Sequence, residues 1–269
     1  MAKTTTRGRF LWHELLTSEP KAALAFYERI VGWKPQPWDK DPSYTLLFTG
    51  DRPIGGVMPL PAEAKGAPPH WASYIETPAL DDTLAKAQKL GARLLKPATP
   101  IPEVGRFGVL TDPQGAMFIA FEPSIEMTVN DPPQPGEFSW HELITTDREA
   151  AFRFYQELFG WEKRQAMDVG TPVGVYQLFG WNGKDMGGIY TKSADMPGPP
   201  NWLPYAMVPD ARKASAEVPK AGGQVFMGPM EVPGGDLILV GQDPQGAAFA
   251  LHSAAPAGAE RKEPAAAGR

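Results

Sequence analysis

Apolar positions recur at helical spacing near the start of the chain, which predicts an amphipathic helix with one buried face. The members of that face are Ala23, Phe26, Tyr27 and Ile30, at i, i+3, i+4 and i+7. Ser18 is a suitable N-cap, Pro20 fits the first turn, and Gly32 can end the helix. Short apolar runs before and after this helix predict strands, at 10–17, 33–38, 44–49 and 54–60.

The same order of elements follows a second time. A strand is expected at 70–76, and a helix from about residue 80, with Leu80, Leu84 and Ala87 on one face and Gly91 at its end. Three further strands are expected near 93–96, 107–111 and 116–122. The pattern therefore predicts two modules, each a strand, a helix and three strands.

The second half of the chain repeats the first. FLWHEL at 10–15 returns as FSWHEL at 138–143, and the turn Asp-Pro-Gln-Gly-Ala occurs at 112–116 and again at 243–247. Asp147 is the expected cap of the helix that repeats the first one. In the last module the helix is weaker because Pro219 interrupts it. Four modules in two homologous units are therefore predicted.

Composition sets the unit boundaries and excludes several classes of function. The expected units are 9–122 and 137–253, joined by a Pro-rich linker at 123–136 and followed by a disordered tail at 254–269. A net charge of −5 without a basic stripe argues against nucleic-acid binding. The absence of cysteine removes disulfides and thiolate chemistry. With no secretory signal or apolar span in the sequence, we expect a cytoplasmic protein that does not enter a membrane.

The segments AFYERIVGW at 25–33 and FRFYQELFGW at 152–161, with the two Asp-Pro-Gln-Gly-Ala turns, resemble the vicinal oxygen chelate superfamily. That superfamily includes glyoxalase I, extradiol dioxygenases and bleomycin-resistance binding proteins. The resemblance implies an α+β fold of two tandem domains. Each would hold two βαβββ modules curled into a half-open barrel, with the site inside the curl. Whether modules pair within a unit or between units is left open by the sequence.

The resemblance also implies where a metal would be held. Metal-using members take ligands from the first, fifth and last strands of a barrel. In this chain those places fall on Trp12, Trp71 and Ile119 in the first unit, and on Trp140, Trp202 and Ala250 in the second. None of these side chains ligates a divalent metal. We therefore expect no metal cofactor. The alternative is one divalent ion such as Zn, Ni, Mn or Fe, with the register slipped by one residue to His13 and His70.

Strand alternation predicts what the curls contain instead. If Trp12 faces the first cavity, Glu14 does too and His13 faces away. The same reasoning turns Trp140 and Glu142 inward and His141 outward. The candidate ligand-binding residues are Trp12, Glu14, Trp71, Arg106, Trp140 and Trp202, with Arg106 as a possible partner of Glu14. The candidate catalytic pair is Glu142 and His252. The Gly-Gly pairs at 55–56 and 187–188 are expected to be bulges.

Three functions fit these residues. The first is a protein of this superfamily that binds a small organic molecule without the usual metal triad, as a binding protein or a metal-independent enzyme. The second is a metal-dependent lyase, isomerase or dioxygenase that uses His13, His141, Glu142 or His252. The third is a non-catalytic scaffold whose cavities are filled by tryptophan. The expected partner is a small organic molecule, and the sequence does not predict an oligomeric state.

Overall fold

The computed structural model describes residues 6–64, 66–171 and 173–255, and most of the tail expected at 254–269 lies outside them. The first unit contains β1 (Phe10–Thr17), α1 (Pro20–Ile30), β2 (Lys34–Trp38), β3 (Asp41–Thr49), β4 (Arg52–Pro59), the 3₁₀ turn η1 (Ala62–Ala64), β5 (His70–Glu76), α2 (Leu80–Lys89), β6 (Arg93–Ile101), β7 (Gly105–Thr111) and β8 (Met117–Pro123). This is the predicted order of a strand, a helix and three strands, used twice.

The second unit repeats that order. It contains β9 (Phe138–Thr145), α3 (Arg148–Phe159), β10 (Glu162–Asp168), β11 (Val175–Trp181), β12 (Lys184–Thr191), β13 (Asn201–Met207), α4 (Ala211–Glu217), the 3₁₀ turn η2 (Pro219–Ala221), β14 (Gln224–Glu231), β15 (Leu237–Gln242) and β16 (Ala248–Ser253). As the sequence predicted, the helix of the last module is short, and Pro219 restarts the chain as a 3₁₀ turn.

Each unit builds its own sheet of eight strands. The orders are β2-β3-β4-β1-β5-β8-β7-β6 and β10-β11-β12-β9-β13-β16-β15-β14. Modules therefore pair within a unit, where the first strands of the two modules, β1 and β5, run antiparallel side by side at the centre of the sheet. The fold is α+β, with two tandem domains of the expected half-open barrel type, and none of its described helices is long and apolar enough to cross a membrane.

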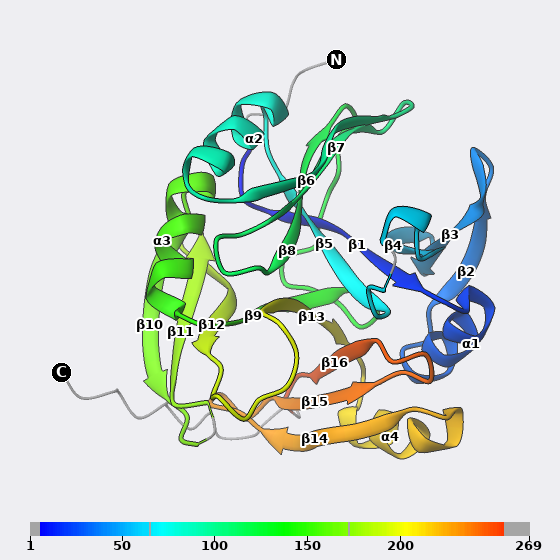
Figure 1. Cartoon of the computed structure of the whole chain (residues 1–269). Coiled ribbons are helices and arrows are strands. Elements are labelled where there is room, and N and C mark those ends of the chain that lie inside the picture. The colour runs from blue at the N-terminus through cyan, green and yellow to red at the C-terminus, as the bar shows by residue number, and fades with distance from the viewer. Residues whose placement is uncertain (1–5, 65, 172, 256–269) are drawn as a thin grey trace.

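The hydrophobic cores, by contrast, are shared between the units. One core joins Leu80, Leu84 and Phe118 of the first unit to the α3 face of the second. The other joins α1 residues such as Phe26 to α4 and β15. Figure 1 shows the resulting helix pairs, α1 beside α4 and α2 beside α3, each made of one helix from each unit. Each sheet thus packs its helix-bearing face against the other unit.

Repeated motifs form the polar contacts inside these shared cores. The hydroxyl of Tyr155 donates to Asp112 (3.1 Å), and it accepts the indole N–H of Trp202 (2.9 Å). The mirror set joins Tyr27, Asp243 and Trp71 at 3.1 and 3.0 Å. Three repeated motifs therefore meet across the interface between the units, which explains why they recur together. They are the Phe-Tyr pair of the helix, the Asp-Pro turn and the tryptophan of the fifth strand.

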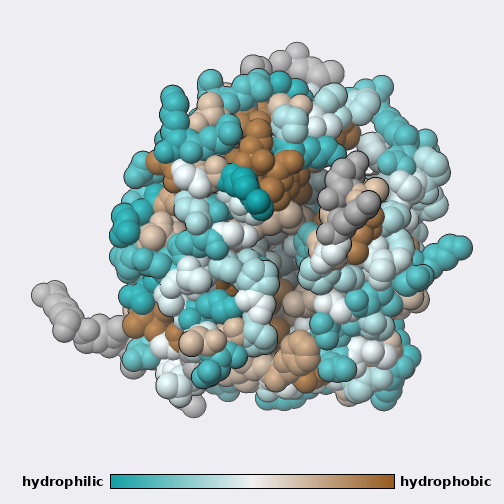
Figure 2. Space-filling model, viewed as in Figure 1, coloured by the Kyte–Doolittle hydropathy of each residue, from teal (hydrophilic) through white to brown (hydrophobic). Residues whose placement is uncertain are grey.

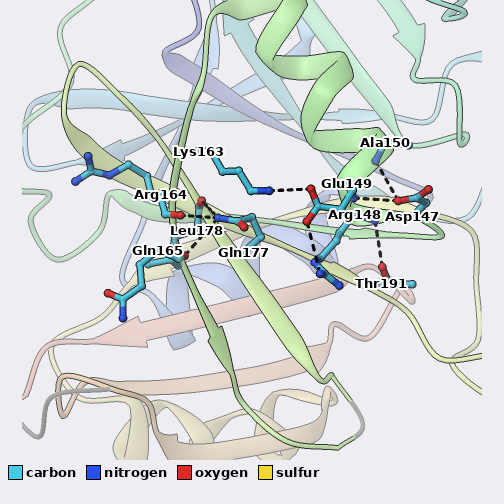
Figure 3. Close-up of polar contacts among 10 residues, drawn as sticks. All are labelled: Asp147, Arg148, Glu149, Ala150, Lys163, Arg164, Gln165, Gln177, Leu178 and Thr191. Atoms are coloured by element: carbon cyan, nitrogen blue, oxygen red, sulfur yellow. Dashed lines mark hydrogen bonds and ion pairs between the residues drawn. The ribbon is translucent and has the colours of Figure 1, made fainter. Parts of the chain in front are cut away.

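The two equivalent helices α1 and α3 begin differently. Asp147 accepts hydrogen bonds from the backbone N–H groups of Glu149 and Ala150, both at 3.0 Å, as Figure 3 shows. This confirms Asp147 as the cap of α3. Ser18 was wrong as the cap of α1, because Glu19 occupies that position and makes no side-chain capping bond. Pro20 at the first turn of α1 lacks a donor that would need capping.

A strand irregularity in the second sheet is stabilised by a side chain. The register between β10 and β11 shifts between Lys163 and Ala166. Gln177, which is buried, donates its amide to the carbonyl oxygen of Arg164 (2.7 Å) across this shift (Figure 3). The side chain thus satisfies a backbone acceptor that the ladder leaves unpaired, as buried polar groups require.

Candidate functional site

A buried carboxylate held by tyrosines lies on the concave face of the first sheet. Glu14 accepts a hydrogen bond from the hydroxyl of Tyr74 (3.1 Å) and is also hydrogen-bonded by Tyr44. The indole N–H of Trp12 donates to the Tyr44 hydroxyl at 2.9 Å. Four side chains from three strands therefore form one connected network around a single carboxylate.

The second unit builds the same network from the equivalent residues. The Trp140 indole donates to the hydroxyl of Tyr176 (2.9 Å), and that hydroxyl donates to Glu142 (2.9 Å). Tyr205 supplies the second hydroxyl to Glu142. The Trp-His-Glu motif of each unit is thus the start of a Trp–Tyr–Glu–Tyr cluster.

Strand register places these residues. On β1, Trp12 pairs with Tyr74 and Glu14 pairs with Ala72, so all four positions lie on one face of the two strands. Tyr44 comes from β3 and reaches across β4 above Gly56. A Cβ atom on Gly56 would lie 2.1 Å from the Tyr44 hydroxyl oxygen.

The Gly-Gly pairs therefore allow neighbouring groups to approach the backbone of their strand closely. A Cβ on Gly188 would lie 1.9 Å from the ring of Tyr176, and one on Gly187 would lie 1.9 Å from a backbone oxygen of β9. The sequence predicted bulges at these pairs. The register shift in each unit instead falls just before the pair, while the glycines themselves continue the parallel ladder with β1 or β9. Glycine leaves the space that the tyrosine ring occupies.

The two carboxylates differ in their charge environment. Burial raises the pKa of Glu142 to about 7, against the hydrogen bonds of Tyr176 and Tyr205, which lower it. Burial also raises the pKa of Glu14, but there Lys96 adds an attraction that lowers it. Burial, and to a smaller extent the negative charge of Glu14, raises the pKa of Tyr44 and Tyr74 well above the usual range. Both hydroxyls therefore stay protonated and can donate.

A cavity of about 1350 Å³ covers the Glu14 cluster and extends into the crevice between the units, where His13, Phe138 and His141 line it. Its floor and walls come mainly from β1, β5, β7 and β8, with Trp12, Glu14 and Tyr74 among the lining residues. It continues beneath the segment that joins the two units, as far as the turn between β11 and β12. In Figure 2 this face of the molecule shows a central hollow with apolar surface above it.

Two of the tryptophans expected in the cavities lie elsewhere. Trp71 and Trp202 are 6% and 5% exposed and belong to the shared cores, where they bond to Tyr27 and Tyr155. The prediction that they form cavity walls was wrong. It assigned each tryptophan to the concave face of its strand, whereas a difference of one position along a strand places the side chain on the opposite face. Trp12 and Trp140 lie within their clusters, beside Glu14 and Glu142 as alternation predicted.

The charged partners expected for the carboxylates were also wrong. Arg106 pairs with Glu122 (2.6 Å) and Asp81 (3.1 Å), because its side chain leaves β7 on the face opposite the cavity-lining Phe107. The cation near Glu14 is instead Lys96.

His252 does not pair with Glu142. Its ring nitrogens contact Ser139 (2.9 Å) and Asp236 (3.0 Å). The acid–base pair that the sequence suggested is therefore not formed, and Glu142 is hydrogen-bonded by Tyr176 and Tyr205 instead.

The two WHEL histidines face away from the carboxylates, as alternation predicted, and they meet each other between the units. The Nε2 atoms of His13 and His141 are 2.8 Å apart. His141 stacks on Phe10 of the first unit, and His13 stacks on Phe138 of the second. Burial lowers the pKa of His141 to about 3 and lowers that of His13 well below its usual range, so both rings are neutral. This pair belongs to the interface between the units.

The side chains around Glu14 do not fit the metal site that metal-using members of the family have. The positions that face the cavity next to Glu14 are Ala72 and Tyr74 on β5, and Ile119 and Phe121 on β8. None of these four side chains is a carboxylate or an imidazole, so Glu14 and His70 on the same face supply at most two ligands, whereas a divalent ion takes three or more from His, Asp, Glu or Cys. Within residues 6–64, 66–171 and 173–255, no such cluster of three occurs.

Sequence reasoning missed Tyr44, Tyr176 and Lys96. Each tyrosine stands the same number of residues before the glycine pair of its own unit, so extending the repeat through these glycines would have aligned them. Lys96 carried no such signal, because the second unit has Met227 at the equivalent position. Lys96 pairs with Val109 on β7, and Met227 pairs with Val240 on β15.

Comparison with known families agrees with the fold. Residues 9–119 match the family described as the Glyoxalase/Bleomycin resistance protein/Dioxygenase superfamily. The match covers most of the first unit and agrees with the vicinal oxygen chelate superfamily that the motifs resemble.

Among individual proteins, the chain is 29% identical over 253 residues to "Putative glyoxylase CFP32" of Mycobacterium bovis, covering 91% of this chain and 94% of that protein. Two solved structures share the fold at low identity. The 2,3-dioxygenase LapB of Pseudomonas sp. KL28 has a TM-score of 0.65 at 12% identity and covers 97% of this chain and 98% of its own. The Mn(II)-bound glyoxalase of Novosphingobium aromaticivorans has a TM-score of 0.63 at 13% identity, over 92% and 82%.

Proposed function

We propose that the first unit binds a small organic molecule in the part of the cavity above Glu14, with Glu14 as the polar group that the molecule meets, and without a metal. One observation carries the proposal. A buried carboxylate, fixed by Tyr44 and Tyr74, lines a large cavity whose other walls are mainly apolar. A mostly apolar pocket with few oriented polar groups is the usual form of a small-molecule site.

Glu14 can serve such a molecule in two ways. As a carboxylate it accepts a hydrogen bond from a ligand hydroxyl or N–H group, and charge-assisted bonds of this kind are strong. Its raised pKa also suits it to take a proton from a bound molecule and return it. Tyr44 and Tyr74 hold the carboxylate in one orientation and would donate to it throughout.

The cavity disfavours the scaffold alternative, because tryptophan does not fill the first curl. The metal-dependent alternative is disfavoured by the donor set around Glu14, since apolar and phenolic side chains occupy the other positions. The first unit is also the better candidate for chemistry than the second. Lys96 stands near Glu14, whereas Glu142 has Met227 at the equivalent position and no His252 partner.

The test compares matched variants of the two carboxylates. Glu14→Gln should weaken binding of compounds found by a screen on tryptophan fluorescence by roughly tenfold or more, because a hydrogen bond to a charged group is lost. Glu142→Gln, which changes the same atom in the second unit, should leave their binding within about twofold. Dissociation constants of both variants and the parent protein are measured by titration.

Equal effects of the two substitutions, or a larger effect of Glu142→Gln, would refute the assignment to the first unit. One tightly held metal ion per chain, measured by elemental mass spectrometry on protein purified without chelators, would refute the metal-independent part of the proposal.

A further inference from the structure

The walls of the cavity near Glu14 are largely apolar. The cavity volume of about 1350 Å³ includes this space and the crevice between the units. A cluster of apolar side chains surrounds the Glu14 network, including Leu11, Ile119 and Phe121, with Phe107 and Val109 packed against it. A ligand that fills this space must therefore bury a large apolar surface.

The segment between the units forms one wall of this cavity. Residues 125–131 line it, and Met127 packs against the same apolar cluster as the cavity floor. Arg52 of β4 holds the segment in place through the Thr128 carbonyl and through Glu137 (2.7 Å), which also accepts from Asn130 (2.7 Å). The linker is thus tied to the first sheet, across its concave side.

The mouth of the cavity exposes apolar side chains to solvent. Leu95 of β6 is 46% exposed, Ile125 45% and Val129 43%, and all three line the cavity. Leu95 comes from the edge strand of the sheet, and the other two come from the linker, so apolar surface flanks the entrance. Such exposed apolar surface marks a place where a ligand gains free energy by covering it.

A histidine also lies on the cavity wall. His70 pairs with Leu16 on the same face of the β1–β5 pair as Glu14. Its Nδ1 contacts the carbonyl oxygen of Pro68 (2.8 Å) and therefore carries the proton, which leaves Nε2 as an acceptor. That Nε2 atom has no hydrogen-bond partner among the residues described and almost no accessible surface, so His70 contributes its ring to the wall and not a free acceptor.

We propose that the cavity takes a mostly apolar organic molecule that carries hydrogen-bond donors, and that the linker between the units selects it. The donors meet Glu14 inside, while the apolar body reaches the mouth and covers Leu95, Ile125 and Val129. This inference rests on the proposed function, because it names the class of molecule for the same site.

The test uses a defined probe, N-phenyl-1-naphthylamine, which is neutral, apolar and carries one N–H donor, and which fluoresces when shielded from water. The parent protein should bind it with a saturable rise in fluorescence. Val129→Asp and, separately, Ile125→Asp should each weaken binding by about tenfold, because a charge at the mouth must lose water when the probe covers it. Val129→Leu should bind as the parent does.

Val169→Asp is the matched control. Val169 is 42% exposed, like Val129, but lies next to β10 in the second unit and outside the cavity lining. Unchanged binding in Val169→Asp beside weakened binding in Val129→Asp would support the inference, and thermal melting would verify that each variant is folded. If the parent does not bind the probe, or if both Val129→Asp and Ile125→Asp bind it as the parent does, the inference is overturned.

The Glu14→Gln variant separates this result from the proposed function. Probe binding that weakens in Glu14→Gln but not in the linker variants would leave the site in the first unit standing and remove the role of the linker. Probe binding that is insensitive to Glu14→Gln and to both linker variants would remove both.

Discussion

At the scale of single residues, the two glutamates show how burial and neighbours set the state of one side chain. Both carry the same pair of tyrosine hydroxyls, yet only Glu14 has a lysine nearby. Lys96 was not foreseeable from the repeat, because the second unit has methionine there. The difference in charge around the two carboxylates therefore comes from a wall residue and not from the motif that the units share.

The raised pKa of Glu142 predicts a pH-dependent stability. Its pKa rises from 4.5 to about 7 on folding, so the folded protein binds this proton more tightly than the unfolded chain does. The free energy of unfolding should then fall by about 3 kcal/mol as pH rises through this interval, and stay level above it. Glu142→Gln should remove this loss, so its stability relative to the parent should rise by about 3 kcal/mol between about pH 4.5 and about pH 8.

Urea unfolding at the two pH values measures the effect. Glu157→Gln, on the exposed face of α3, is the control and should follow the parent at both. A stability difference between Glu142→Gln and the parent that does not change with pH would contradict the assignment of a proton to Glu142.

At the scale of elements, equivalent helices obtain their first turn by different means. Asp147 caps α3 through two backbone N–H groups, whereas Glu19 makes no capping bond at α1 and Pro20 takes the first turn. The sequence predicted the helices and most strands because the spacing of apolar residues along the chain does not depend on which elements pack against them. It misplaced the cap of α1, since Ser18 and Glu19 are both compatible with the pattern.

Asp147→Ala should destabilise the protein by about 1 kcal/mol, because two donors at the start of α3 lose their acceptor. Glu19→Ala at the equivalent position of α1 should change stability by less than about 0.5 kcal/mol. The midpoints of urea unfolding for both variants test this. Equal losses at the two positions would show that the cap of α3 is not what distinguishes them.

At the scale of the whole molecule, the units are separate in their sheets and joined in their cores. Each core takes its side chains from both units, and the Tyr155–Asp112 and Tyr27–Asp243 bonds cross between them. The His13–His141 contact lies at the same interface. A unit alone would leave the apolar face of its sheet and helices in water.

Residues 1–133 expressed alone should therefore lack a cooperative unfolding transition and dispersed amide signals in NMR. Mixing them with residues 134–269 should restore both, because the two fragments complete each other's cores. The full chain, unfolded and refolded under the same conditions, is the control. A stable, well-dispersed fragment without its partner would refute the shared-core description.

The sequence by itself determined the local order of elements and the repeat, because hydrophobic periodicity and turn residues act over short stretches of chain. It also placed Trp12 and Glu14 together, since alternation along one strand needs no knowledge of its neighbours. Only the tertiary structure decided that Trp71 and Trp202 serve the interface, that Arg106 and His252 have other partners, and that the linker lines the cavity. Those contacts join residues far apart in the chain, and a shift of one residue in strand register moves a side chain to the opposite face of the sheet.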